Sequence, residues 1–188
     1  MAASPGRTLV LLRHAKSAWP DIPDHDRPLA SRGQRDAPVI GRWLRKSGHV
    51  PDQVVCSTAQ RARETWQLAQ PKLQAQPPVR FDRRVYLASA TQLLELVRRA
   101  PPATETLLIV GHDPGVPQLA LMLAAAIAPT TTDTWADAAR AMAERMQAKF
   151  PTAAVAVLEF SGSWDQLAAA SAQLTGFVTP RDLATAQR

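Results

Sequence analysis

The chain has 188 residues, 46% of them hydrophobic, and a formal net charge of +6 at pH 7. This length and apolar content suit one globular domain with a buried core and argue against extended disorder. The longest apolar run covers residues 119–128, well short of the roughly 20 residues that a membrane-spanning helix needs. A single cysteine excludes an intrachain disulfide and a cage of thiolates around a metal ion.

The start of the chain lacks the basic residues and apolar stretch of a secretory signal. We therefore expect a flexible N-terminus at residues 1–6, one domain over 7–188 and a cytoplasmic location. The excess of 22 Lys and Arg over 16 Asp and Glu favours anionic partners. Because the basic residues form no single run, the charge fits a solvated surface equally well. Neither a nucleic acid nor a membrane is expected as a partner.

Short apolar runs alternate with longer amphipathic stretches along the chain. In chain order, the first half predicts a strand at 8–12, a helix at 33–46, a strand at 53–56, a helix at 59–70 and a weaker strand at 79–85. The second half predicts a helix at 91–99, a strand at 106–110, helices at 116–128 and 133–149, and strands at 154–160 and 173–178. This alternation predicts an α/β fold around a mainly parallel sheet.

Arginine and histidine side chains follow three of the predicted buried strands. Arg13 and His14 follow the first strand, Arg61 begins the helix after the second, and His112 follows the strand at 106–110. Ligands of such sheets bind beyond the carboxyl ends of the strands, so we expect these side chains to meet at one edge. A neutral imidazole can attack phosphorus, and guanidinium groups can bind phosphate oxygens in pairs. Each residue alone reads as an ordinary turn or surface residue, but together they indicate a phosphate site.

The motifs around these residues resemble those of the histidine phosphatase superfamily, which has the phosphoglycerate mutase-like fold. The family's Arg-His-Gly hallmark reads Arg-His-Ala at residues 13–15. Its Ser-x-x-x-Arg-Ala segment matches residues 57–62, and its late Gly-His matches residues 111–112. The run at 13–20 and an Asp-x-x-Arg-Pro-Leu-x-x-x-Gly pattern at 24–33 are similar to SixA-like phosphohistidine phosphatases. The resemblance implies a three-layer α/β/α fold.

By this resemblance, His14 forms the phosphohistidine intermediate, while Arg13, Arg61 and His112 line the phosphate pocket as further catalytic residues. The substrate would be a phosphohistidine on a signalling or phosphotransfer protein, and phosphate would be the product. No metal or other cofactor is expected. Two alternatives are a hydrolase of a small phosphomonoester, such as a sugar or nucleotide phosphate, and a non-catalytic module that binds phosphorylated partners.

Three further residues are candidates for substrate binding. The resemblance makes Arg27 a pocket or rim residue, and Lys16 and Ser17 lie where contacts on the substrate side would fall. Lys16 could equally be an exposed charge.

The sequence departs from the family pattern where larger members carry a glutamate general acid. Residues 83–87 of this chain contain no carboxylate. A departing alkoxide needs a proton in the transition state, whereas a departing imidazole needs it far less. The missing acid therefore favours a phosphoramidate substrate, although Asp21, Asp24 or Asp26 could supply a proton. The same acidic loop could suggest a metal ion, but such loops are more commonly just solvated.

Overall fold

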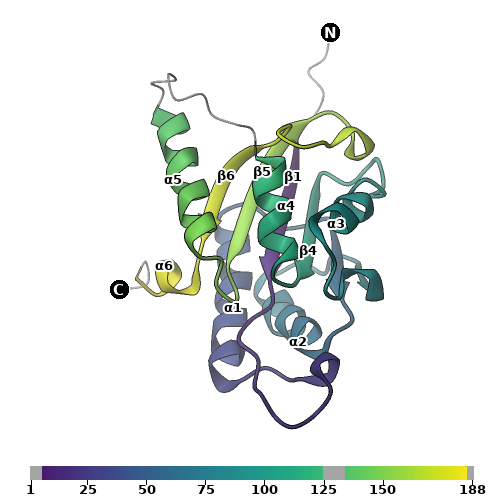
Figure 1. Ribbon diagram of the computed structural model, residues 1–188, viewed down its shortest axis with the longest axis vertical. Helices are drawn as coiled ribbons and strands as arrows, with labels where there is room; N and C mark the ends of the chain where they lie inside the picture. Colours follow the sequence, from purple (N-terminus) through teal and green to yellow (C-terminus); the bar gives the residue numbers. More distant parts are fainter. Residues whose placement is uncertain (1–5, 125–133, 186–188) are drawn as a thin grey trace.

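A six-stranded β-sheet forms the centre of the structure, a computed structural model that describes residues 6–124 and 134–185 (Figure 1). Its strands are β1 (Gly6–Arg13), β2 (Gln53–Ser57), β3 (Val79–Asp82), β4 (Thr106–Gly111), β5 (Val155–Ser161) and β6 (Gln173–Val178). They lie in the order β3-β2-β4-β1-β5-β6. The first four in this order pair in parallel, and β5 runs antiparallel to both of its neighbours. The predicted mainly parallel α/β sheet is confirmed.

Helices cover both faces of this sheet and give three α/β/α layers (Figure 1). They are α1 (Ser31–Lys46), α2 (Gln60–Ala69), α3 (Ala90–Val97), α4 (Gly115–Leu123), α5 (Thr134–Ala148) and α6 (Pro180–Thr185). Leu9 and Leu11 of β1 belong to the core under α3, α4 and α5, whereas Val10 and Leu12 belong to the core under α1, α2 and α6. All four side chains are fully buried, which explains the unbroken apolar run of this strand.

The predicted strand at 79–85 is too long at its carboxyl end. The strand stops at Asp82, whose carboxylate accepts a hydrogen bond from the main-chain N–H of Arg84 at 2.9 Å. This bond caps a 3₁₀ turn over Arg83–Val85, which replaces the end of the predicted strand.

Two other differences concern the two ends of the chain. Helix α6 was not predicted, and Gly6 already belongs to β1 although a flexible segment was expected at 1–6. Residues 1–5 and 125–133 lie outside the described residues, as do the parts of the predicted helices that fall there. In the two described stretches of the chain, no helix is both long and apolar enough to cross a membrane.

The loop between β1 and α1 is closed at its base by main-chain contacts. Ser17 and Leu29 form an antiparallel bridge, and the N–H of Ala30 donates to the carbonyl of Lys16 at 2.9 Å. Gly33, in the first turn of α1, lies so close that a Cβ there would be 2.2 Å from the same Lys16 oxygen. The glycine of the 24–33 pattern therefore allows α1 to pack against the segment that follows the first strand.

Candidate active site

The carboxyl ends of β1, β2 and β4 bring His14, Arg61 and His112 together. Because Arg13 pairs with Gly111 across β1 and β4, the residues that follow are neighbours, and the two histidine rings have centroids 5.1 Å apart. Arg61 lies in the first turn of α2, where its Nε donates to His14 Nε2 at 3.2 Å and its Nη2 lies 3.4 Å from His112 Nδ1. The three side chains are buried. One guanidinium thus contacts both imidazoles.

Hydrogen bonds fix the orientation of the His14 ring. Its Nδ1 lies 2.8 Å from the carbonyl oxygen of Ala15, which can only accept, so Nδ1 carries the proton. The unprotonated Nε2 then faces Arg61. The main chain is held as well, because the N–H of His14 donates to the Gly111 carbonyl at 3.0 Å and that of Ala15 donates to Thr65 Oγ1 at 3.0 Å. Nε2 is therefore the nitrogen that carries the lone pair, which accepts the hydrogen bond from Arg61 in this structure.

Burial and neighbouring cations keep both imidazoles neutral. The pKa of His14 is lowered from its usual 6.5 to about 4, chiefly by desolvation, with the hydrogen bond to Ala15 opposing this shift and the charges of Arg61 and Arg13 adding to it. Desolvation also lowers the pKa of His112 to about 3, with contributions from His14 and Arg61. At neutral pH, His14 therefore keeps the lone pair that nucleophilic attack requires.

These pKa values predict that the protein loses stability between pH 6.5 and pH 4. The unfolded chain protonates both histidines near pH 6.5, but the folded chain does so only near pH 4 for His14 and pH 3 for His112. The unfolded state binds more protons in this window, so the free energy of unfolding decreases as the pH is lowered. Each histidine contributes at most about 1.4 kcal/mol per pH unit to this decrease. Urea denaturation from pH 4.5 to 7 measures this slope. A His14→Gln/His112→Gln variant should lose most of it, and an unchanged slope would contradict the assignment.

The Asp24 carboxylate joins two arginines and a tyrosine beside the histidines. Its Oδ1 accepts from Arg27 Nη1 at 2.8 Å, and its Oδ2 accepts from Arg61 Nη2 at 2.9 Å and from the Tyr86 hydroxyl at 2.7 Å. The hydrogen bond from Tyr86 and those from the two arginines hold the pKa of Asp24 far below its usual range. An ionised carboxylate only accepts hydrogen bonds, so Asp24 does not supply the proton that the sequence suggested it could.

Tyr86 was not anticipated from the sequence as part of the site. Besides donating to Asp24, its ring packs edge-on against His112 and His25, with centroid distances of 5.4 and 4.9 Å. Desolvation and the hydrogen bond to Asp24 raise the pKa of its hydroxyl, which stays protonated at neutral pH. The residue lies in the 83–87 segment, which follows β3 at the same edge of the sheet as the other strand ends. That position is the signal that could have revealed it.

Ser57 is a second residue that sequence reasoning gave no role. It ends β2, and its Oγ lies 2.7 Å from His112 Nε2 while also accepting from the N–H of Ala59 at 3.2 Å. A ring nitrogen bound in this way fixes the orientation of the imidazole. Ser57 thus holds His112 so that its Nδ1 faces Arg61.

Arg13 lies beside this cluster with one donor unpaired. Its Nη1 donates to the carbonyl of Phe150 at 2.6 Å, and its Nη2 is 3.5 Å from the Asp113 carboxylate. Its buried Nε has no hydrogen-bond partner among the described residues. Such unpaired buried donors are rare and costly. The charge of Arg13 also lowers the pKa of His14, so Arg13 adds to the positive potential around the histidines.

The three predicted substrate-binding residues occupy different positions. Arg27 is buried and donates to Ser17 Oγ at 2.7 Å and to the Ala18 carbonyl at 3.0 Å, in addition to Asp24. The exposed ring of Trp19 covers the Arg27 guanidinium, with 3.3 Å between Cζ and the ring centroid. Arg27 and Ser17 therefore stabilise the loop around the site. The Lys16 side chain is exposed, and only its main chain contributes to the loop base.

No group of three or more His, Cys, Asp or Glu residues within 6–124 and 134–185 is arranged to hold a metal ion. The polar groups of the site instead suit an anion, because the site combines guanidinium donors with a neutral imidazole. On an α/β/α fold, this site fits the class of enzymes that act on phosphoryl groups.

Comparisons with known proteins agree with this class. The family profile of the histidine phosphatase superfamily (branch 1) matches residues 9–86. A candidate phosphohistidine phosphatase SixA from Nakamurella multipartitia is 32% identical with a TM-score of 0.78, and the match covers 95% of this chain and 98% of that one. The corresponding SixA candidate from Agrobacterium tumefaciens is 27% identical with a TM-score of 0.71, covering 94% and 99% of the two chains. An uncharacterized protein of Mycobacterium tuberculosis is 44% identical over 171 residues, which is 90% of this chain and 100% of that one.

The chain therefore belongs to the histidine phosphatase superfamily, and it is SixA-like within that superfamily. The family and the phosphoglycerate mutase-like fold that the sequence motifs implied are confirmed, as is the expectation of a phosphatase.

Proposed function

We propose that the protein removes phosphoryl groups from phosphohistidine on a signalling or phosphotransfer protein, with His14 carrying the phosphoryl group from substrate to water. The observation that carries this proposal is the state of His14, which is buried and neutral, with the proton on Nδ1 and the lone pair of Nε2 facing Arg61. The lone pair of Nε2 becomes free for attack when Arg61 turns its N–H groups to the oxygens of the phosphoryl group, and the arginines suit a phosphorus that carries negative charge.

The first step transfers the phosphoryl group to the enzyme. Nε2 of His14 attacks phosphorus, the bond from phosphorus to the substrate nitrogen breaks, and its electron pair stays with the departing imidazole. Arg61 binds the oxygens of the transferring group, and the charges of Arg61 and Arg13 neutralise the negative charge on it. In the second step, water attacks the phosphorus of phospho-His14, and one of its protons passes to an oxygen of the phosphoryl group. The P–N bond breaks, and orthophosphate leaves while His14 recovers its lone pair.

The protonation states at the site favour a nitrogen-bound phosphoryl group over an ester. An imidazole leaves as a neutral molecule when its other ring nitrogen carries a proton, so the substrate itself brings the proton that departure requires. An alkoxide needs a proton from the enzyme. Asp24 is ionised and therefore supplies none.

The second candidate function, hydrolysis of a small phosphomonoester, is favoured by one observation. The hydroxyl of Tyr86 stays protonated at neutral pH and lies next to His112, so it is a possible donor to an alkoxide. Its raised pKa makes it a weak acid, which is why we place this function second.

A comparison of two substrates tests the proposal. Hydrolysis of a phosphohistidine-bearing phosphotransfer protein and of para-nitrophenyl phosphate would be measured with a chelator present and with the His14→Ala variant as control. We expect the phosphohistidine protein to react faster by several orders of magnitude and the variant to be inactive. Radioactive phosphate should become trapped on the wild-type enzyme in an acid-labile, base-stable form.

Other results would change the assignment in defined ways. Equal rates with the ester would favour the phosphomonoester hydrolase, with Tyr86 as the proton donor to test next. Labelling of the His14→Ala variant would show that His14 does not carry the phosphoryl group. Loss of activity with chelator would contradict the predicted independence of metal ions. The cytoplasmic location stays a prediction.

A further inference from the structure

A basic groove of about 350 Å³ lies between α1, the end of α5 and the start of α6. Four of its nine lining residues are basic and none is acidic, and the basic ones are Arg32, Arg145, Lys149 and Arg181. Its floor contains the buried ring of Phe177, which contacts Phe150 at a centroid distance of 5.2 Å. The groove therefore combines an apolar floor with a cationic rim.

The uniform charge distinguishes this groove from its neighbours. The pocket beyond Tyr86 combines Glu95 with two arginines, and the pocket beside His25 is lined by both Asp26 and Glu64. At the basic groove, Asp36 and Asp182 compensate two of the four cations through contacts of 3.3 and 2.7 Å.

Two exposed cations keep their charge available at this rim. Lys149 and Arg181 have no ion-pair partner among the described residues, and both side chains are exposed. Their positive charge is therefore free to attract an anionic ligand.

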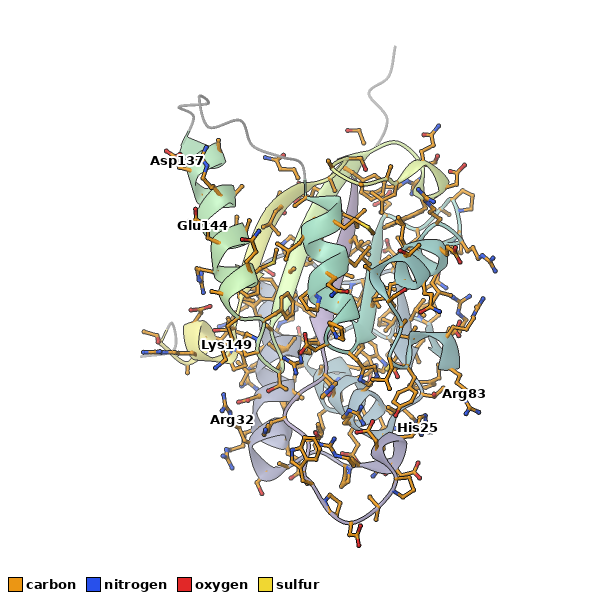
Figure 2. The ribbon with its side chains drawn as sticks, in the orientation of Figure 1. His25, Arg32, Arg83, Asp137, Glu144 and Lys149 are labelled. Atoms are coloured by element: carbon orange, nitrogen blue, oxygen red, sulfur yellow. The ribbon has the colours of Figure 1, made fainter. Side chains whose placement is uncertain are left out.

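Residues that follow the groove lining in the chain contact the segment of Arg13, His14 and Lys16. The residue after Lys149 is Phe150, whose carbonyl accepts the hydrogen bond from Arg13, and further along the same connection the N–H of Ala153 donates to the carbonyl of His14 at 3.1 Å. On the opposite wall, Arg32 precedes the glycine that packs against the base of the active-site loop. Figure 2 shows Lys149 at the end of α5 and Arg32 on α1, on the same side of the molecule.

We propose that this groove docks an acidic segment of the partner protein that lies next to its phosphohistidine. The inference rests on the proposed function, since it assigns the surface that recognises the polypeptide around the phosphoryl group. Carboxylates of such a segment meet Lys149 and Arg181 at the rim, and an apolar side chain reaches the floor beside Phe177. A single-stranded nucleic acid fits less well, because the ring of Phe177 is buried and offers no exposed face for base stacking.

Binding of unphosphorylated peptides tests the groove without reference to turnover. One fluorescein-labelled peptide has four glutamates beside a histidine, and a second has four serines in their place. We expect the acidic peptide to bind wild type about tenfold more tightly at low salt, with the difference shrinking as salt screens the charges. The Lys149→Glu/Arg181→Glu variant should lose this preference. A third ligand, a labelled oligodeoxythymidine of about the same length, tests whether the groove binds a single-stranded nucleic acid instead.

A matched control separates the groove from the overall charge of the protein. Lys46→Glu/Lys72→Glu makes the same change in net charge with exposed residues at the carboxyl end of α1 and just beyond α2, away from the site. This variant should keep most of the preference for the acidic peptide. Equal losses in both double variants, no preference in the wild type, or tighter binding of the oligonucleotide than of the peptide would each overturn the proposal.

Kinetics with phosphorylated substrates connect the groove to the reaction. Phosphoimidazole is too small to reach the groove, so Lys149→Glu/Arg181→Glu should cleave it at the wild-type rate while KM for the phosphohistidine form of the acidic peptide rises about tenfold. Normal cleavage of phosphoimidazole with an unchanged KM for the peptide would refute the groove and leave the proposed function intact. Failure of the wild type to cleave both phosphoimidazole and the phosphohistidine peptide would instead refute the proposed function, while the binding assay still decides on the groove.

Discussion

Replacing Arg61 with alanine is expected to reduce kcat/KM for a phosphohistidine substrate by about a thousandfold. The guanidinium contacts both imidazoles and Asp24 at once, so its loss removes charge stabilisation of the transferring group and the contact that faces His14 Nε2. Arg61→Lys keeps the charge but loses the planar fork and should still cost about a hundredfold. Steady-state kinetics of the purified variants measure both effects.

The neighbouring Arg63 provides the control for this prediction. It lies two positions further along α2, and its guanidinium packs over the ring of Phe81 at 5.2 Å, away from the histidines. Arg63→Ala should keep kcat/KM within about twofold of the wild type, as expected for a surface substitution. If Arg61→Ala kept more than a tenth of the wild-type activity while remaining folded, Arg61 would not be the main group that neutralises the phosphoryl charge.

Replacing Gly33 with alanine is expected to lower the free energy of unfolding by about 3 kcal/mol and to reduce activity as well. The added Cβ would meet the Lys16 carbonyl oxygen at 2.2 Å and two further main-chain atoms at 3.0 Å, and main-chain atoms cannot rotate away as a flexible side chain can. The start of α1 and the active-site loop must then separate, which disturbs the bridge between Ser17 and Leu29. Urea denaturation and kcat/KM would be measured on the same preparation.

Gly6→Ala is the matched substitution for this experiment. A Cβ at Gly6 would have no atom within 4 Å, so this variant should be as stable as the wild type. Wild-type stability of Gly33→Ala would show that the loop and the helix can separate without cost, in contradiction to the tight packing.

The sequence was sufficient to predict the parts of the site that depend on strand ends. His14 and His112 were placed together because each follows a strongly apolar run, and parallel strands end at one edge of a sheet. The buried strands were recognisable from their apolar runs. For example, β1 packs against a helical layer on each face and carries only apolar side chains between residues 9 and 12.

The contacts around Asp24 could not be predicted in this way. They join Asp24 to Arg61 and Tyr86, which are 37 and 62 residues away in the chain, and they depend on how an irregular loop folds back over the sheet edge. Neither hydrophobic periodicity nor propensity describes such a loop. The carboxyl end of β3 was missed for a similar reason, because a single side-chain cap at Asp82 stops a strand that propensity alone would continue.

The ion pairs of Asp24 affect how readily the enzyme completes a cycle. Since this carboxylate occupies N–H groups of Arg61 and Arg27, a phosphate that binds to the same groups exchanges one anion for another. The free energy gained is then the difference between two ion pairs, which is far smaller than the whole of one. If His14 carries the phosphoryl group as proposed, we expect the orthophosphate product to be held weakly and to inhibit turnover little.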